Sequence, residues 1–216
     1  LEQALNVVTG IGGRLATRLV LPERVRAGRT FTGFIYYENT GDSNLEAPLF
    51  EVLGYNGNVI LWETETFSGE LSSARFLGVS QGRGMPSILA PGEGYSIAFE
   101  AVANMTNEAR FKLFVKDPQA TEPMDLSALE SLVIPDVECD CWEQAWQIVR
   151  STCGSTVGSY IGALTAAADR AAEFGLDLIS ERAVLTFMVR EAAQTLESPI
   201  LAGRILLSPG QAAGER

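Results

Sequence analysis

The sequence predicts a mixed protein, in which an antiparallel β-sandwich is followed by a small antiparallel α-helical segment. Up to about residue 117, short runs of alternating apolar and polar residues are separated by Gly, Pro and Asn, the pattern of strands and turns in a sandwich. Beyond residue 140, apolar residues recur at the spacing of amphipathic helices. The predicted division is a sandwich at 1–117, a connector rich in proline and acidic residues at 118–139, and helices at 140–216.

Residues 30–44 carry the clearest strand signal. Phe31, Gly33, Ile35 and Tyr37 share one parity, so they point to one face of the predicted strand. A cluster of turn formers then ends the strand, because these side chains bond their own backbone or tolerate left-handed backbone angles. The cluster comprises Asn39, Gly41, Asp42, Ser43 and Asn44.

Further strands are expected at residues 5–8, 14–21, 48–53, 59–63, 75–79, 95–103 and 110–116. Asn56 and Gly57 predict a type I′ hairpin between the third and fourth of these, because both central residues of that turn need positive φ. In the last two strands, alternation predicts an inward face. The inward residues are Tyr95, Ile97, Phe99 and Ala101, then Phe111, Leu113 and Val115, with Phe114 as the exception.

Three short motifs in the first half occur in the same order as in a known family. Arg26-Ala27-Gly28-Arg29 precedes a strand that closes on Asn39-Thr40-Gly41, and Leu89-Ala90-Pro91-Gly92-Glu93 opens a late strand. Residues 5–117 thereby resemble bacterial extracellular immunoglobulin-like repeat modules of the cell-adhesion-related type. The resemblance implies an immunoglobulin-like fold and a secreted or surface-displayed spacer or binding module. Residues 64–87 depart from the pattern as an insertion or an extra hairpin.

The connector and helices are predicted from caps and apolar spacing. Asp125 is expected to cap a short helix that carries Leu126, Leu129 and Leu132, so the connector should lie along a surface. The three helices are expected to begin at Asp140 with a capping box to Glu143, at residue 156, and behind Asp177. They end near Gly154, Gly175 and Pro199. Short connections favour antiparallel neighbours. The predicted buried faces are Trp142, Ala145, Trp146 and Val149; Tyr160, Leu164, Ala167, Ala168 and Ala171; and Leu178, Leu185, Met188, Val189, Ala192 and Leu196.

The composition argues against whole classes of function. With 27 acidic and 16 basic residues, the net charge is −11, so we expect neither nucleic acid nor membrane as a partner. The chain contains no histidine, which removes Ser-His-Asp catalysis and imidazole metal sites. Lys112 and Lys116 are the only lysines. We therefore predict that the protein is not an enzyme, and assign no catalytic, cofactor-binding or metal residue.

The three cysteines, Cys139, Cys141 and Cys153, leave at least one thiol free or paired with another chain. A helix between Cys141 and Cys153 would separate them by about 18 Å, whereas a disulfide needs Cα atoms within about 7 Å. If a disulfide forms, Cys139 is the expected partner of either.

Two groups of oxygen ligands raise the hypothesis of a calcium site. Asp136, Glu138 and Asp140 alternate along an extended segment, and Asp42 and Asn44 lie in the first turn. A solvated acidic connector and ordinary turn chemistry explain the two groups better.

Aromatic residues raise a second hypothesis, a platform for sugar or a partner helix. Trp142 and Trp146 lie one helical turn apart, and Trp62 lies near Tyr55 in the predicted hairpin. Core packing and cross-strand pairing are the favoured interpretations.

We therefore expect a non-enzymatic structural or protein-interaction module of a large bacterial secreted or cell-surface protein. Its partners would be protein domains of the same or another chain. Because the sequence begins at Leu1, we expect it to be a piece of a longer protein. The alternative is a carbohydrate-binding or calcium-dependent accessory module of a multidomain hydrolase. A carboxylate-based hydrolase is the least favoured interpretation.

Overall fold

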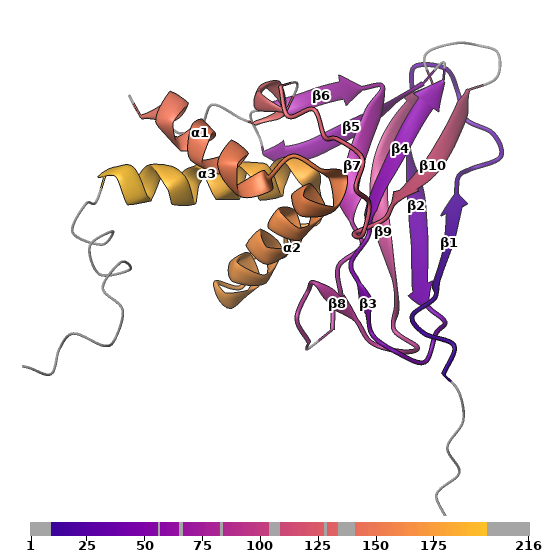
Figure 1. Cartoon of the computed structure of the whole chain (residues 1–216). Coiled ribbons are helices and arrows are strands. Elements are labelled where there is room, and N and C mark those ends of the chain that lie inside the picture. The colour runs from indigo at the N-terminus through magenta and orange to yellow at the C-terminus, as the bar shows by residue number, and fades with distance from the viewer. Residues whose placement is uncertain are drawn as a thin grey trace, which may run out of the picture.

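The computed structural model describes residues 10–55, 57–64, 67–82, 84–103, 109–127, 129–133 and 141–197. These residues form antiparallel sheets and three α-helices, so the predicted mixed class is confirmed (Figure 1). The strands are β1 Leu15–Val20, β2 Thr30–Asn39, β3 Leu45–Glu46, β4 Leu49–Tyr55, β5 Gly57–Thr64, β6 Phe67–Leu71, β7 Ser73–Leu77, β8 Ile88–Leu89, β9 Gly94–Ala103 and β10 Arg110–Lys116. The helices are η1 Glu130–Leu132, α1 Trp142–Cys153, α2 Val157–Glu173 and α3 Glu181–Glu197.

The larger sheet has the order β1-β2-β9-β5-β6. Its centre is the antiparallel pair of β2 and β9, which runs from Thr30 opposite Val102 to Glu38 opposite Gly94. The strands predicted at 14–21, 30–39 and 95–103 are thereby confirmed. The strand predicted at 5–8 lies outside the described residues.

The second sheet has the order β10-β4-β7, and β3 pairs with β8 in a small third sheet. The predicted hairpin between 48–53 and 59–63 is wrong, because β4 and β5 belong to different sheets. β10 and β7 pair with the two edges of β4, so no edge of β4 is left for β5. β5 pairs with β9 and β6 in the larger sheet instead. Of β5 and β6, only β6 lies wholly within the segment 64–87 that departs from the family pattern.

The two sheets face each other across one apolar core. The inward parity of β2 and β9 supplies Ile35, Tyr37, Ile97 and Phe99, all at most 4% exposed. The second sheet contributes Phe50, Val52, Ala74 and Phe76 to the same cluster, with Phe111 and Leu113 packed against it. Val115 was predicted to point inward, and this prediction is wrong, since Val115 is 43% exposed. The inward alternation of β10 does not continue beyond Leu113.

The turn after β2 is organised by the side chain of Asn39, which is fully buried. Its Nδ2 donates to the carbonyls of Ser43 and Leu89, both at 2.9 Å. Its Oδ1 accepts from the backbone N–H groups of Arg14 at 3.2 Å and Gly41 at 3.0 Å. One amide thus satisfies four groups from three segments of the chain.

The helices confirm the predicted apolar faces and correct two of the predicted starts. α1 begins at Trp142, after Cys141, whose side chain makes no cap hydrogen bond, so the helix starts later than predicted; the predicted capping box rests on Asp140, which lies outside the described residues. α2 has the capping box of Thr156 and Ser159. α3 begins after Ser180, whose Oγ accepts from the N–H of Ala183 at 3.1 Å, so Asp177 is not its cap.

The helices pack directly on the second sheet (Figure 1). Leu49 and Leu77 of that sheet belong to the same buried cluster as Trp146, Tyr160 and Leu185. The connector also packs there, since Leu129 is buried in this cluster and Leu126 and Leu132 lie against it. The connector therefore lies along a surface, as predicted, and the helices share a core with one end of the second sheet. Within the described ranges, none of the helices has the length and apolar character that a membrane crossing requires.

Candidate functional site

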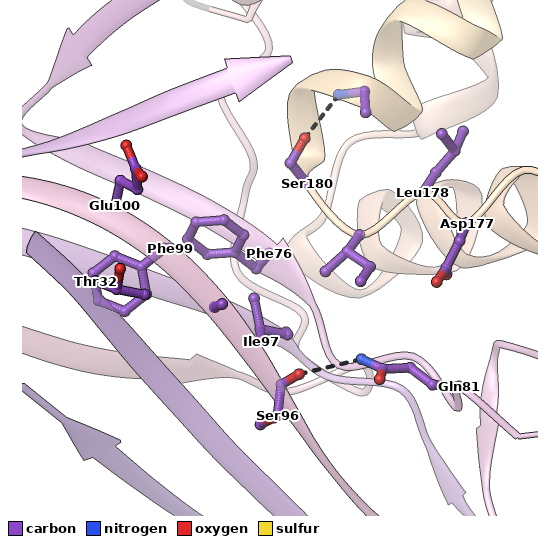
Figure 2. Close-up of a pocket in the computed structure, with 13 residues that line it drawn as sticks. Thr32, Phe76, Gln81, Ser96, Ile97, Phe99, Glu100, Asp177, Leu178 and Ser180 are labelled. Atoms are coloured by element: carbon purple, nitrogen blue, oxygen red, sulfur yellow. Dashed lines mark hydrogen bonds between the residues drawn. The ribbon is translucent and has the colours of Figure 1, made fainter.

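A cavity of about 670 Å³ lies where the helices meet the sheets. Figure 2 shows Phe76, Ile97 and Phe99 on one side of it, facing Asp177 and Ser180 across the opening. The first side comes from β7 and β9, and the second from the segment between α2 and α3.

The cavity exists because β5 leaves β9 partway along its length. β5 pairs with β9 only from Gly57 opposite Ala103 to Ile60 opposite Glu100, and continues by pairing with β6. The lining includes consecutive residues of β9, from Ser96 to Glu100. On the side of β9 where β5 has left, no described strand pairs with residues 96–99, so the cavity lies along this edge of β9.

The opposite wall is fixed by the segment before α3, which extends the second sheet. The N–H of Leu77 donates to the carbonyl of Ile179 at 2.7 Å, and Phe76 forms an antiparallel bridge with Ser180. Ile179 also packs against the core between the sheets. This pairing replaces the helical turn that the sequence predicts at residues 177–180.

A polar network holds this wall to the sheet. Arg75 Nη1 lies 3.1 Å from Glu181 Oε1, which also accepts from Tyr160 Oη at 2.6 Å. On its other side, Arg75 Nε lies 3.4 Å from Glu51 Oε1, and Lys116 Nζ lies 3.5 Å from Glu51 Oε2. The network connects β10, β4 and β7 to α2 and α3.

The network shifts the acid–base equilibria of its members. Burial by itself would raise the pKa of Glu51, but the positive charge of Arg75, the Ser73 hydroxyl and Lys116 outweigh it, so the pKa lies below its usual value. Burial would lower the pKa of Arg75, and the charges of Glu181 and Glu51 raise it overall. Burial and then Glu181 raise the pKa of Tyr160. Arg75 therefore stays cationic and Tyr160 stays protonated, as a donor to Glu181.

Gln81, from the loop after β7, is one of the residues that line the cavity. Gln81 Nε2 donates to the carbonyl oxygen of Ser96 at 3.4 Å (Figure 2). The start of this loop is held by the Tyr37 hydroxyl, which donates to the carbonyl of Val79 at 2.6 Å. Gln81 itself is exposed.

The lining contains polar as well as apolar side chains. The Ser180 hydroxyl caps α3, and the carboxylates Glu100 and Asp177 lie on opposite sides of the opening in Figure 2. The remaining lining is largely apolar, and it includes neither Lys nor Arg among the described residues. Nor does the described part of the chain bring together three Cys, Asp or Glu residues as a metal site.

A second cavity of about 570 Å³ is lined by residues of β1, β2 and β9. Ala16, Arg18 and Tyr36 are among its lining residues, and the Arg18 guanidinium stacks 5.0 Å from the centre of the Tyr36 ring. This cavity contacts a sheet face, whereas the first one follows a strand edge.

Neither Cys141 nor Cys153 lines the cavity. Cys141 is disulfide-bonded, and its partner lies outside the described residues. Cys153 is a free thiol, buried in the core of the helices, so the pairing of Cys141 with Cys153 that the helix geometry disfavours does not occur. Burial, and then the charge of Glu181, raise the pKa of Cys153 to about 12.

Asp42 acts as a turn residue. Its Oδ2 accepts from the N–H of Ile11 at 2.7 Å and its Oδ1 from the N–H of Gly12 at 2.8 Å. Both carboxylate oxygens therefore hold the segment that precedes β1. Asn44 lies exposed in the same turn. Asp136, Glu138 and Asp140 lie outside the described residues.

The tryptophan pair of α1 packs within the protein. Trp146 is 3% exposed, and Trp142 packs against the same core while its Nε1 donates to Glu130 Oε1 at 3.3 Å. Core packing therefore accounts for both tryptophans, which is the interpretation that the sequence favours. Tyr55 is 48% exposed, and the side chain of Trp62 lies outside the description.

Sequence reasoning missed the cavity, although it predicted β9 and its faces. Alternation shows which side chains point inward, but it carries no information about where a neighbouring strand ends. The departure of β5 from β9 had one signal, the long segment 64–87 that breaks the family pattern.

No protein-family model matches the chain, and no curated protein matches it.

Proposed function

We propose that this protein is a non-enzymatic module that binds another polypeptide, with an immunoglobulin-like arrangement of its strands. The observation that carries the proposal is the cavity along β9, which combines an apolar floor with an open strand edge. Such edges are used by proteins to bind extended segments. The resemblance of residues 5–117 to bacterial cell-adhesion-related modules supports the same function.

We further propose a bacterial secreted or cell-surface location. The disulfide at Cys141 supports it, because structural disulfides persist mainly in oxidising compartments. The partner would be a protein domain of the same or another chain.

The test is selection of a phage-displayed library of random peptides against the whole chain. We expect enriched peptides whose binding is lost when the cavity is filled by Ala98→Trp. The matched control is Ala16→Trp, which adds the same side chain at an exposed alanine in the second cavity. Failure to enrich any peptide, or equal loss in both variants, would contradict the function.

A glycan array addresses the carbohydrate alternative. We expect no reproducible binding. Binding that disappears in Trp62→Ala would favour a carbohydrate-binding module over the proposal.

A further inference from the structure

The backbone of β9 shows in which direction its free groups point. The carbonyls of Glu93 and Ala103 both accept hydrogen bonds on the β2 side, from Asn39 N at 2.9 Å and from Gly28 N at 2.8 Å. The register between β2 and β9 is continuous. Backbone direction alternates along a strand. The N–H and C=O groups of the odd-numbered residues of β9 therefore point towards β2, and those of the even-numbered residues point away from it.

Gln81 Nε2 donates to the carbonyl of Ser96, an even-numbered residue whose backbone groups, by this assignment, point away from β2. On that side, no described strand pairs with residues 94–99, since the pairing with β5 begins at Glu100. The N–H and C=O groups of Ala98 therefore point into the cavity.

We propose that this edge binds an extended peptide of another protein domain by strand addition, an inference that rests on the proposed function. Backbone groups of the peptide would pair with Ser96 and Ala98. Its inward side chains would contact the floor formed by Phe76 and Ile179, and its alternate side chains would face solvent. The preferred peptide thus has alternating apolar and polar residues.

The charge of the site defines the partner further. Glu100 and Asp177 line the opening, and the chain has a net charge of −11. A peptide with Lys or Arg near its ends complements these carboxylates. An acidic peptide is disfavoured for the same reason.

In the unbound protein, the side chain of Gln81 occupies one hydrogen-bonding group of this edge. Its bond to the Ser96 carbonyl is long, at 3.4 Å, and its side chain is exposed. A peptide N–H replaces this bond when Gln81 swings away. Natural sheets protect their free edges with such devices against unspecific pairing.

The central test is Ala98→Pro, because proline removes the N–H that points into the cavity and leaves the pairing with β2 intact. We expect peptides enriched from the phage library to alternate apolar and polar residues with basic ends, and to bind this variant at least about tenfold more weakly. Ala98→Val, which keeps the N–H, should weaken binding less than Ala98→Pro does. Gln81→Ala should strengthen binding about two- to fivefold.

Hydrogen exchange measured by NMR tests the edge independently of how Ala98→Pro folds. In the free chain, the amide of Ala98 should exchange at least about tenfold faster than that of Phe99, and an enriched peptide should protect it. A protected Ala98 amide in the free chain would overturn the proposal, because the edge would then already be covered. If Ala98→Trp blocks peptide binding but Ala98→Pro leaves it unchanged, strand addition is overturned and the proposed binding function stands.

Discussion

Arg75 and Glu181 join the second sheet to the third helix. Arg75 lies on β7 and Glu181 is the first residue of α3, and their Nη1 and Oε1 atoms are 3.1 Å apart. The side chain of Glu181 is only 5% exposed. The segment that walls the cavity ends at this contact, so the ion pair holds that wall and the start of α3 against β7.

We expect Glu181→Ala to lower the free energy of unfolding by about 3 kcal/mol, because it leaves the charge of Arg75 and the hydroxyl of Tyr160 without their shared acceptor. Urea unfolding followed by circular dichroism measures the change. The control is Glu191→Ala, since Glu191 pairs with Arg170 at 2.9 Å on the surface, where the cost should be below about 1 kcal/mol. Equal costs in the two variants would show that burial of the pair is unimportant.

Glu51 should make the stability depend on pH. Its pKa is lower in the folded than in the unfolded protein, so its contribution is fully present above the unfolded value of 4.5 and is lost as the pH falls through the folded value. We expect the difference in unfolding free energy between wild type and Glu51→Gln to shrink as the pH falls from about 6 to about 3. A difference that stays constant over this range would contradict the role of Arg75 and Lys116 as partners of Glu51.

Asn39→Ala should destabilise the protein by about 3 kcal/mol, because four buried or half-buried backbone groups lose their partner. Thermal unfolding measures the effect. Asn44→Ala is the matched control: Asn44 is exposed in the same turn, and its substitution should cost less than about 0.5 kcal/mol. A small effect at Asn39 would mean that water satisfies the backbone groups as well as the amide does.

A thiol titration tests the state of the cysteines. In the native protein at about pH 8, iodoacetamide should not modify Cys153, because its thiol is buried and its pKa is raised to about 12. After denaturation without a reductant, one thiol per chain should react. Three reactive thiols would contradict the disulfide at Cys141.

The local pattern was enough to predict much of the fold. Strands 30–39 and 110–116 and helix 156–174 were predicted almost to the residue, because each carries its own alternation or caps. The predictions failed where another part of the chain competes for the same residues. Asp177 is a good helix cap by itself, but residues 177–180 lie beside β7 and pair with it.

The sequence by itself determined the inward faces of β2 and β9, the turn at Asn39 and the apolar faces of the helices, since these depend on periods of two and 3.6 residues. Only the tertiary structure decided that β4 and β5 lie in different sheets and that β9 keeps a free edge beside Asp177 and Ser180. Strand neighbours are chosen by contacts between residues far apart in the sequence, because an edge carries the same backbone groups whatever its side chains are. The candidate binding site consists of such backbone groups, and for this reason it became visible only in the folded chain.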